Sequence, residues 1–440
     1  MTARQRLLFL APVMPSDRGN GLAMRTGFFL DAYSRQFDVD LAVIPLLSRS
    51  DDAGAFALSR VKRMTVLRQP GMDTYFSLVK ATRDPAARLL AFRRYGLPSL
   101  AGFSADDSVQ SLSEWADIDR YDVIHISRLY LAKIVAAWTT SSTQHPPLVI
   151  DCDEDDARAY RRMAALSRGQ EYAHWAVAEA DAFVMLAREL LPRFSVTFVA
   201  SHSDRQSLAR AGRRIEVIPN VSKPNMAKRV PRLHQMQRRH PRTVLFVGTM
   251  AYAPNADGAR WFISRVWPRL RRAFGSPLRL LIVGHNPSPS LRRLSRGGEI
   301  VVTGTVRDVD DFYRQADLAV IPIRAGGGSR VKLLEAAAFG VPIVSTRLGA
   351  EGLAFRPGRE LLIADDAGKF ARACAAVLRR HTLAQSLVRR AWLRLRTDYD
   401  GERWARIVTG TVATIGDEDG QRGLKTREEK EGNKVQWPRS

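Results

Sequence analysis

Short apolar runs alternate along the chain with longer segments in which apolar residues recur at helical spacing. Such runs, rich in Leu, Ile, Val and Ala, are typical of strands that are buried on both faces of a parallel sheet. The alternation predicts βαβ units and therefore an α/β fold. We expect strands at residues 7–11, 39–45, 123–126, 148–150, 182–186, 196–199 and 215–218, and again at 243–247, 278–283, 300–303, 318–321, 343–345 and 361–363.

The two groups of strands are separated by a basic, proline-containing stretch, residues 222–242. We therefore predict two Rossmann-like domains, 1–221 and 243–397, which this stretch links. A helix at 398–415 should follow. The polar segment 416–440 has no apolar periodicity, and we expect it to be disordered. Ligands of open parallel sheets bind beyond the carboxyl ends of the strands, so the site should lie where these two edges face each other across a cleft.

Composition narrows the class of protein. The chain has 440 residues, of which 45% are hydrophobic and 26% charged, as in globular proteins. Cys152 and Cys374 are the only cysteines, too few for a disulfide framework or a Cys-rich zinc site, and they suggest a reducing compartment. The first apolar run is too short for a signal peptide, and no run is long enough to span a bilayer. We expect a cytoplasmic protein.

Basic residues exceed acidic ones by 68 to 45, a formal net charge of +23. Residues 1–221 are nearly neutral, with 28 basic and 25 acidic side chains, so the excess lies in the linker and the second half. Such a balance favours nucleic-acid binding, but no signature of a nucleic-acid-binding motif is present and the arginines are scattered singly. An anionic membrane surface on the inner face of the cytoplasmic membrane is the preferred partner. The segment 75–95 mixes aromatic and aliphatic residues with five basic ones, a composition that is typical of segments that bind an anionic membrane surface.

The strongest local motif follows the strand predicted at 318–321. Three glycines, Gly326, Gly327 and Gly328, precede Ser329, which is placed to cap a helix that runs to about residue 339. Glycines let a ligand approach the backbone closely, and the free N–H groups of a helix start attract an anion.

Charged residues in the first turns of this helix also favour an anion-binding site. Arg330 and Lys332 are unfavourable near a positive helix end unless an anion such as a diphosphate offsets them. Glu335 lies three residues after Lys332, on the same side, where it could accept hydrogen bonds from sugar hydroxyls. The alternative is a loop with solvated basic residues and a stabilising Lys332–Glu335 pair.

A second glycine turn follows the first strand. Gly19, Asn20 and Gly21 open a helix that contains Arg25, and this turn should face the first motif across the cleft. It could equally be a flexible loop. Neither turn matches the Walker A or G-x-G-x-x-G pattern, which argues against ATPase and dehydrogenase functions.

Taken in chain order, several stretches resemble the family 4 glycosyltransferases, which are retaining enzymes of the GT-B fold. The resemblance covers about residues 6–410 and is nearest to the bacterial exopolysaccharide and cell-envelope branch. The stretches that carry it are Gly19-Asn20-Gly21, Tyr121–His125, Ile218–Val221, Leu245–Asn255, Val302–Val306, Ala316–Pro322 and Gly326–Thr346 with its continuation to Leu353.

The resemblance implies a fold and a set of roles. Two Rossmann-like domains would face each other across a cleft, and the C-terminal helix would return to the first domain. Arg330 and Lys332 would bind the diphosphate of a nucleotide-sugar donor, and Glu335 its ribose. The remaining donor or acceptor contacts would come from Gly19, Asn20, Gly21, Arg25, Gly248, Thr249, Tyr252, Asn255, Val306, Gly326, Gly327, Gly328 and Ser329.

Two positions depart from the family pattern. The family usually has Glu-x7-Glu, whose first acid contacts the transferred sugar, but here Gly327 stands eight residues before Glu335. A catalytic-site histidine is often found at the position of Ser127, whereas this chain has His125. His125 is then either a cleft residue or a core residue. Arg128, just beyond that strand, is a second candidate for the cleft.

The acidic run that begins at Asp151 offers a runner-up chemistry. Asp151 and Asp153 follow a strand, as the metal-binding acids of GT-A transferases do. The tandem architecture argues against that fold, so we expect no metal and assign Asp153 to the acceptor side.

We therefore expect a retaining transferase that moves a sugar from a nucleotide-diphosphate sugar to a saccharide or lipid-linked acceptor. A catalytically inactive binding subunit of the same fold is the alternative.

Overall fold

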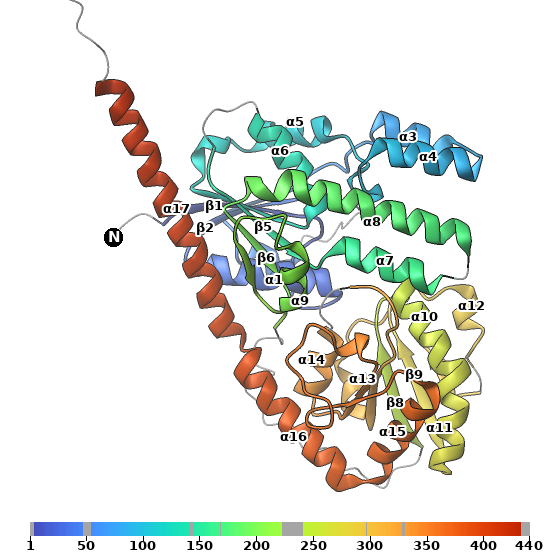
Figure 1. Ribbon diagram of the computed structural model, residues 1–440. Helices are drawn as coiled ribbons and strands as arrows, with labels where there is room; N and C mark the ends of the chain where they lie inside the picture. The colour runs from blue at the N-terminus through green and yellow to red at the C-terminus, as the bar shows by residue number, and fades with distance from the viewer. Residues whose placement is uncertain are drawn as a thin grey trace, which may run out of the picture.

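The computed structural model describes residues 4–46, 54–140, 145–167, 169–221, 241–295, 297–327 and 331–432. Two parallel sheets, one in each half of the chain, confirm the predicted pair of Rossmann-like domains, which are stacked one above the other in Figure 1. Nearly all of the predicted linker lies outside the described residues, as do Gly328, Ser329 and Arg330.

The first sheet has the strand order β3-β2-β1-β4-β5-β6-β7 and the second β10-β9-β8-β11-β12-β13, with every pair parallel. In each sheet the order reverses beside the first strand of the domain, which opens a crevice at the carboxyl edge. The strands are β1 Arg6–Ala11, β2 Asp38–Val43, β3 Arg63–Val66, β4 Val123–Ser127, β5 Leu148–Asp153, β6 Val196–Val199, β7 Ile215–Val217, β8 Arg242–Val247, β9 Leu278–Val283, β10 Ile300–Val302, β11 Leu318–Ile321, β12 Ile343–Ser345 and β13 Leu362–Ile363.

Helices cover both faces of each sheet. Those of the first domain are α1 Gly21–Ser34, α2 Ala55–Leu58, α3 Thr74–Ala81, α4 Pro85–Tyr95, α5 Ala105–Trp115, α6 Ala132–Thr140, α7 Asp156–Leu166, α8 Gln170–Leu190 and α9 His202–Leu208. Those of the second are α10 Ala253–Trp261, α11 Trp267–Phe274, α12 Pro289–Arg292, α13 Asp310–Gln315, α14 Val331–Ala338, α15 Ala367–Arg379 and α16 His381–Asp398, and α17 Gly401–Gly432 ends the described chain.

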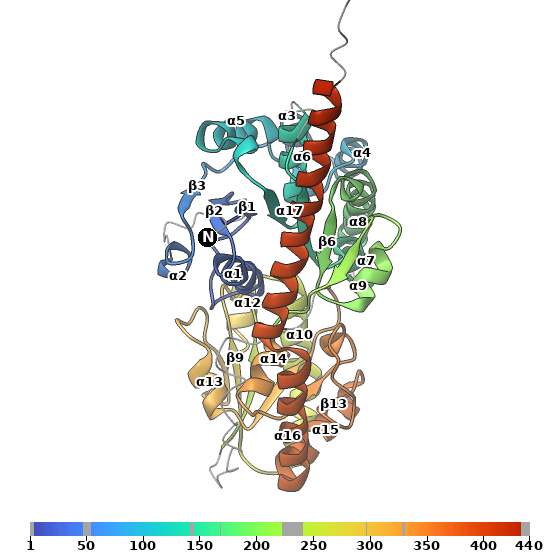
Figure 2. The same ribbon diagram turned by 90° about the vertical axis from the view of Figure 1, so that its left-hand side faces the viewer.

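The C-terminal helices join the domains, as predicted. α16 packs on α14 and α15 of the second domain, and α17 then runs back along the first, against α1 and β4 (Figure 2). Val408, Val412 and Ile415 complete the apolar cluster that covers one face of the first sheet. The helix continues to Gly432, which departs from the disordered tail expected from residue 416. Its many Glu, Lys, Arg and Gln residues are good helix formers.

Two strand assignments differ from the sequence prediction. Residues 182–186, predicted as a strand, lie within the 21-residue helix α8. A short apolar run has the same pattern in a buried helix as in a buried strand, and the flanking alanines favour the helix. The edge strand β3 was not predicted, because its sequence, RMTV, is half exposed and carries no continuous apolar signal. Within the described residues, no helix is long and apolar enough to cross a membrane.

Candidate functional site

The glycine-rich loop after β11 lies against the start of α10. Gly326 has φ +90°, a conformation that side chains other than glycine's rarely adopt. A Cβ there would also lie 2.8 Å from Pro254 Cγ and 2.9 Å from the Tyr252 hydroxyl. The close approach explains the glycine and brings the predicted residues Tyr252 and Gly326 together at the carboxyl edge of the second sheet.

Lys332, in the first turn of α14, is held by a short chain of contacts. Its Nζ donates a 2.7 Å hydrogen bond to Asn255 Oδ1, and Asn255 Nδ2 donates one of 3.0 Å to the Thr249 carbonyl. Gly248 leaves room for this amide, since a Cβ there would lie 2.9 Å from Asn255 Nδ2. Because Asn255 is buried, the ammonium is fixed in place beside the glycine-rich loop. Four of the predicted donor-site residues thus form one unit.

Glu335 lies one turn further along α14. The Tyr313 hydroxyl donates a 3.1 Å hydrogen bond to Glu335 Oε2 and lies 3.3 Å from the Lys332 carbonyl. Burial, and after it the neighbouring Glu335 carboxylate, raises the pKa of Tyr313 well above its ordinary value, so the phenol remains a donor. Tyr313 therefore orients Glu335. Val306, predicted to flank the base, is half-buried on the loop after β10.

The turn before α1 faces this helix from the first domain. Asn20 caps α1 by accepting a 2.9 Å hydrogen bond from the Ala23 N–H, and Gly19 before it has φ +95°. A Cβ on Gly21 would lie 3.7 Å from Cγ2 of Val331, the first residue of α14. The starts of α1 and α14, one from each domain, therefore lie close together, as the sequence predicts.

A buried charged network closes the carboxyl edge of the first sheet. Arg128 and Asp153 both have positive φ, +80° and +61°, although neither is glycine. The Arg128 guanidinium lies 2.6 Å from Asp156 Oδ1, 3.3 Å from Asp153 Oδ2 and 3.6 Å from Glu154 Oε1. Burial raises the pKa of Asp153. Strained backbone of this kind is typical of functional sites, and here it places one guanidinium among three carboxylates.

Arg25 belongs to the same network but is enclosed. Its Nε and Nη2 each donate a 2.7 Å hydrogen bond to Asp151, and Nη1 donates one of 3.0 Å to the Ile218 carbonyl. Both charged side chains are only 1% exposed. The expected substrate contact of Arg25 is contradicted, because its donors are used inside the domain. Asp151 is likewise unable to serve as the metal ligand of the runner-up chemistry.

His125 is a core residue. It is fully buried among Phe9, Phe29 and Phe198, and its Nδ1 lies 2.6 Å from the Tyr33 hydroxyl. Burial, with a smaller contribution from Arg25, lowers its pKa to about 3. Its side chain points into the sheet's covered face, because alternate residues of a strand face opposite sides. The expectation that His125 binds substrate is wrong.

Contacts between the domains gather at the glycine-rich loop. Arg162 of α7 pairs with Glu351, which follows β12, through Nη1–Oε2 and Nη2–Oε1 distances of 2.5 and 2.8 Å. Its Nη1 also lies 3.4 Å from the Gly326 carbonyl. Nearby, Glu154 Oε2 would lie only 2.2 Å from a Cβ on Gly327. α7 and the turn that precedes it therefore border the glycine-rich loop.

The chain is similar in sequence and in fold to known glycosyltransferases. Residues 241–380 match the family model described as "Glycosyl transferases group 1". These residues form a glycosyltransferase group 1 domain. The segment that contains the glycine-rich loop, Lys332, Glu335 and Asn255 lies wholly inside it.

One curated relative matches a shorter part of the chain. It is the "uncharacterized 44.6 kDa protein in cps region" of Klebsiella pneumoniae, 26% identical over 141 residues. The match covers 30% of this chain and 36% of that protein, so the chain spans about a third of the relative's length.

Solved structures resemble the chain over nearly its whole length. Sucrose-phosphate synthase from Thermosynechococcus elongatus aligns with a TM-score of 0.67 at 15% identity, over 94% of this chain and 99% of that one. Trehalose 6-phosphate synthase from Burkholderia multivorans gives 0.63 at 13%, over 96% and 99%. Anabaena HepE, in complex with UDP and glucose, gives 0.59 at 15%, over 93% and 100%. The fold is GT-B, which rules out the GT-A alternative.

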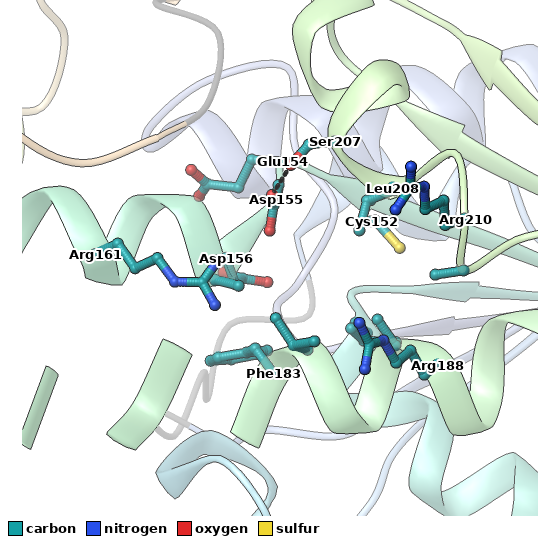
Figure 3. A pocket seen from close by; sticks show the side chains of 15 residues that line it. Cys152, Glu154, Asp155, Asp156, Arg161, Phe183, Arg188, Ser207, Leu208 and Arg210 are labelled. Atoms are coloured by element: carbon teal, nitrogen blue, oxygen red, sulfur yellow. Dashed lines mark hydrogen bonds between the residues drawn. The ribbon is translucent and has the colours of Figure 1, made fainter. Parts of the chain in front are cut away.

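A pocket of about 240 Å³ opens in the first domain, on the side of α7 that faces α8 and α9 (Figure 3). Asp155, Asp156 and Phe183 line it together with the basic residues Arg161, Arg188 and Arg210. Glu154 also lines it (Figure 3). The acidic turn after β5 thus borders both this pocket and the glycine-rich loop.

Among the described residues, no group of three or more His, Cys, Asp or Glu side chains is arranged to hold a metal ion. Sequence reasoning missed three residues: Glu154 and Arg162, which border the glycine-rich loop, and Tyr313, which contacts α14. Glu154 lies in the acidic run that begins at Asp151, and its place directly after a strand end was the available signal. Arg162 and Tyr313 lie on ordinary amphipathic helices, where no local pattern distinguishes them.

Proposed function

We propose that the chain is a nucleotide-sugar-dependent glycosyltransferase. The observation that carries the proposal is the placement of Lys332, which Asn255 holds, and of Glu335, which Tyr313 orients, on the first turns of α14, directly after a glycine-rich loop. A fixed ammonium suits a diphosphate, and a carboxylate one turn away suits the hydroxyls of a ribose. The bound UDP and glucose of the structurally similar HepE support this kind of donor.

The proposed reaction retains the configuration of the transferred sugar. The acceptor hydroxyl oxygen forms a bond to the anomeric carbon on the face from which the diphosphate leaves. The electron pair of the broken C–O bond goes to the diphosphate oxygen, which takes the acceptor's proton. Lys332, Arg330 and the helix start stabilise the charge that develops on that oxygen, and preorganised donors of this kind usually contribute most to such catalysis. No metal ion is part of the proposal.

A donor panel tests it. Purified protein is incubated with UDP-glucose, UDP-galactose, UDP-N-acetylglucosamine, GDP-mannose and ADP-glucose, and release of the nucleoside diphosphate is measured. We expect release from at least one donor, together with a higher Tm in the matching nucleoside diphosphate. Binding without release would instead support an inactive binding subunit. If no nucleotide binds, the proposed function is wrong.

The acceptor is proposed to be a saccharide or a lipid-linked saccharide, used in polysaccharide or cell-envelope assembly. The cps-region relative supports this class. The α3–α4 hairpin, at the end of the first domain away from the second (Figure 1), is the proposed membrane contact. Its inner residues Phe76 and Phe92 pack on α8, whereas Tyr75, Leu78 and Leu90 are 42%, 63% and 54% exposed. Lys80, Arg83, Arg93 and Arg94 are exposed around them.

Apolar residues ringed by basic ones suit an anionic lipid surface. The test is co-sedimentation with vesicles of phosphatidylcholine alone and with 30% phosphatidylglycerol. We expect binding only to the second, and at least a fivefold loss in Arg93→Glu/Arg94→Glu. Arg269→Glu/Arg272→Glu, on α11 of the second domain, makes the same change in net charge as a control. Equal loss in both variants would contradict a dedicated contact.

A further inference from the structure

Glu154 and Gly327 occupy one place in the cleft from opposite domains. Glu154 Oε2 lies where a side chain at position 327 would begin, since an added Cβ would be 2.2 Å away, closer than real contacts allow. Gly327 is not among the glycines with positive φ. Its backbone would accept any residue, so the space taken by Glu154, rather than backbone conformation, accounts for the glycine.

The Glu154 carboxylate is presented rigidly. It follows Asp153 at φ +61°, and its own N–H donates a 2.7 Å hydrogen bond to the Cys152 carbonyl, which makes a tight turn. Asp155 then caps α7 through the Arg158 N–H. Arg128 Nη2 lies 3.6 Å from Glu154 Oε1, and the side chain is 15% exposed. A held carboxylate of this kind can discriminate among ligands at little entropic cost.

The chemistry of a carboxylate decides which part of a donor it can contact. An ionised carboxylate only accepts hydrogen bonds, so it suits hydroxyl groups and repels phosphate oxygens. Lys332, whose ammonium Asn255 holds in the first turn of α14, is the group that suits the diphosphate. The group bound next to Glu154 is therefore the sugar and not the phosphates.

We propose that Glu154 of the first domain binds a hydroxyl of the transferred sugar, in the place that the acid expected at position 327 would take. The proposal rests on the proposed function and adds a specificity residue to it. Because the carboxylate and the glycine-rich loop belong to different domains, the sugar contact is complete only when the cleft is closed.

The first test removes the charge while keeping the shape. Glu154→Gln is compared with the parent for binding of the best donor from the panel and of its nucleoside diphosphate, by calorimetry, and for turnover. We expect donor kcat/KM to fall at least 50-fold and donor affinity at least fivefold, with nucleoside diphosphate affinity within twofold. Glu189→Gln, on the exposed face of α8, is the matched control and should match the parent. An equally active Glu154→Gln, or a parallel loss of nucleotide affinity, would overturn the proposal.

The second test moves the carboxylate between domains. Gly327→Glu alone should lose activity, because it collides with Glu154. Glu154→Ala/Gly327→Glu should recover at least tenfold over Glu154→Ala. Since a Cβ at 327 would lie 3.0 Å from Ala159 Cβ, a second version also carries Ala159→Gly. If neither version recovers activity, the idea that Glu154 takes the place of an acid at position 327 is refuted. Failure of the proposed function would appear differently, as a parent that neither binds nor turns over any donor.

Discussion

Arg162 and Glu351 form a two-armed ion pair that ties α7 of the first domain to the loop after β12 of the second. Their side chains are 26% and 33% exposed, so the pair contributes at most about 1 kcal/mol to closure of the cleft. We expect Arg162→Ala to raise the donor KM by up to about fivefold with kcat nearly unchanged. The reversed pair Arg162→Glu/Glu351→Arg should bring KM back toward the parent. Steady-state kinetics of the three proteins measures this, and a reversed pair whose KM stays at or above that of Arg162→Ala would argue against the pair.

Lys332 should carry a large share of diphosphate binding. We expect Lys332→Met to lower kcat by about 100-fold, because it removes a fixed cation from the place where leaving-group charge develops. Asn255→Ala should have a smaller effect in the same direction, because it removes the 2.7 Å hydrogen bond that holds the Lys332 ammonium in place. Arg272→Met, on the exposed end of α11, removes one positive charge elsewhere as a control. Single-turnover rates distinguish the three, and a normal rate in Lys332→Met would exclude this role.

Tyr313 is a positioning residue. Tyr313→Phe removes the 3.1 Å hydrogen bond to Glu335 while keeping the ring that stacks on Phe339. We expect the donor KM to rise about threefold to tenfold and kcat to change little, because the hydrogen bond orients Glu335 in the ground state and the transition state alike. Glu335→Gln should raise KM further, and the double variant should add little to it. Additive effects would show that the two residues act separately.

His125 should make stability depend on pH. Its pKa of about 3 in the folded protein lies below the ordinary value of 6.5. The unfolded chain therefore binds a proton between these two pH values that the folded protein does not, and stability must fall as pH drops through that window. The slope from this group is roughly 1.4 kcal/mol per pH unit well below pH 6.5. Urea unfolding at pH 7 and pH 5 should show a smaller loss in His125→Gln than in the parent.

The Arg25–Asp151 pair should be essential to the first domain's stability. Because both side chains are 1% exposed, removing one leaves a buried charge without its partner. We expect Arg25→Met to destabilise the protein by about 3–5 kcal/mol. Arg25→Met/Asp151→Leu should be less destabilising than the two single changes added together. Chemical denaturation of the four proteins checks this, and simple additivity would contradict the coupling.

The parallel strands of both domains follow from sequence because each is a short β-branched or apolar run between glycine, proline or polar turns. The strand predicted at residues 182–186 was wrong, because a buried helix shows the same continuous apolar character over one turn. The residues assigned to the donor side could be proposed from sequence, because glycines, a predicted cap and charges lie close together along the chain, and their roles stay predictions. Contacts between Glu154 and Gly327, or Arg162 and Glu351, join residues more than 160 positions apart. No local pattern encodes them.

His125 shows a further reason why a site cannot be read from residue type alone. A histidine near the end of a strand suggests chemistry, but alternate positions on a strand face opposite sides of the sheet. At position 125 the ring faces three phenylalanines. Only the register of β4 against β1 and β5 decides this, and it depends on the whole sheet.

The return of α17 to the first domain has a consequence for synthesis on the ribosome. Val408, Val412 and Ile415 cover the same face of the sheet as Leu7 and Phe9. At about 5–20 residues per second, the nascent first domain waits on the order of ten to forty seconds after its last strand emerges before this helix arrives. During that interval the part of the apolar sheet face that α17 covers in the finished protein stays exposed and open to chaperones. A ribosome that stops before residue 408 therefore releases a product that quality-control proteases can recognise by its unfinished first domain.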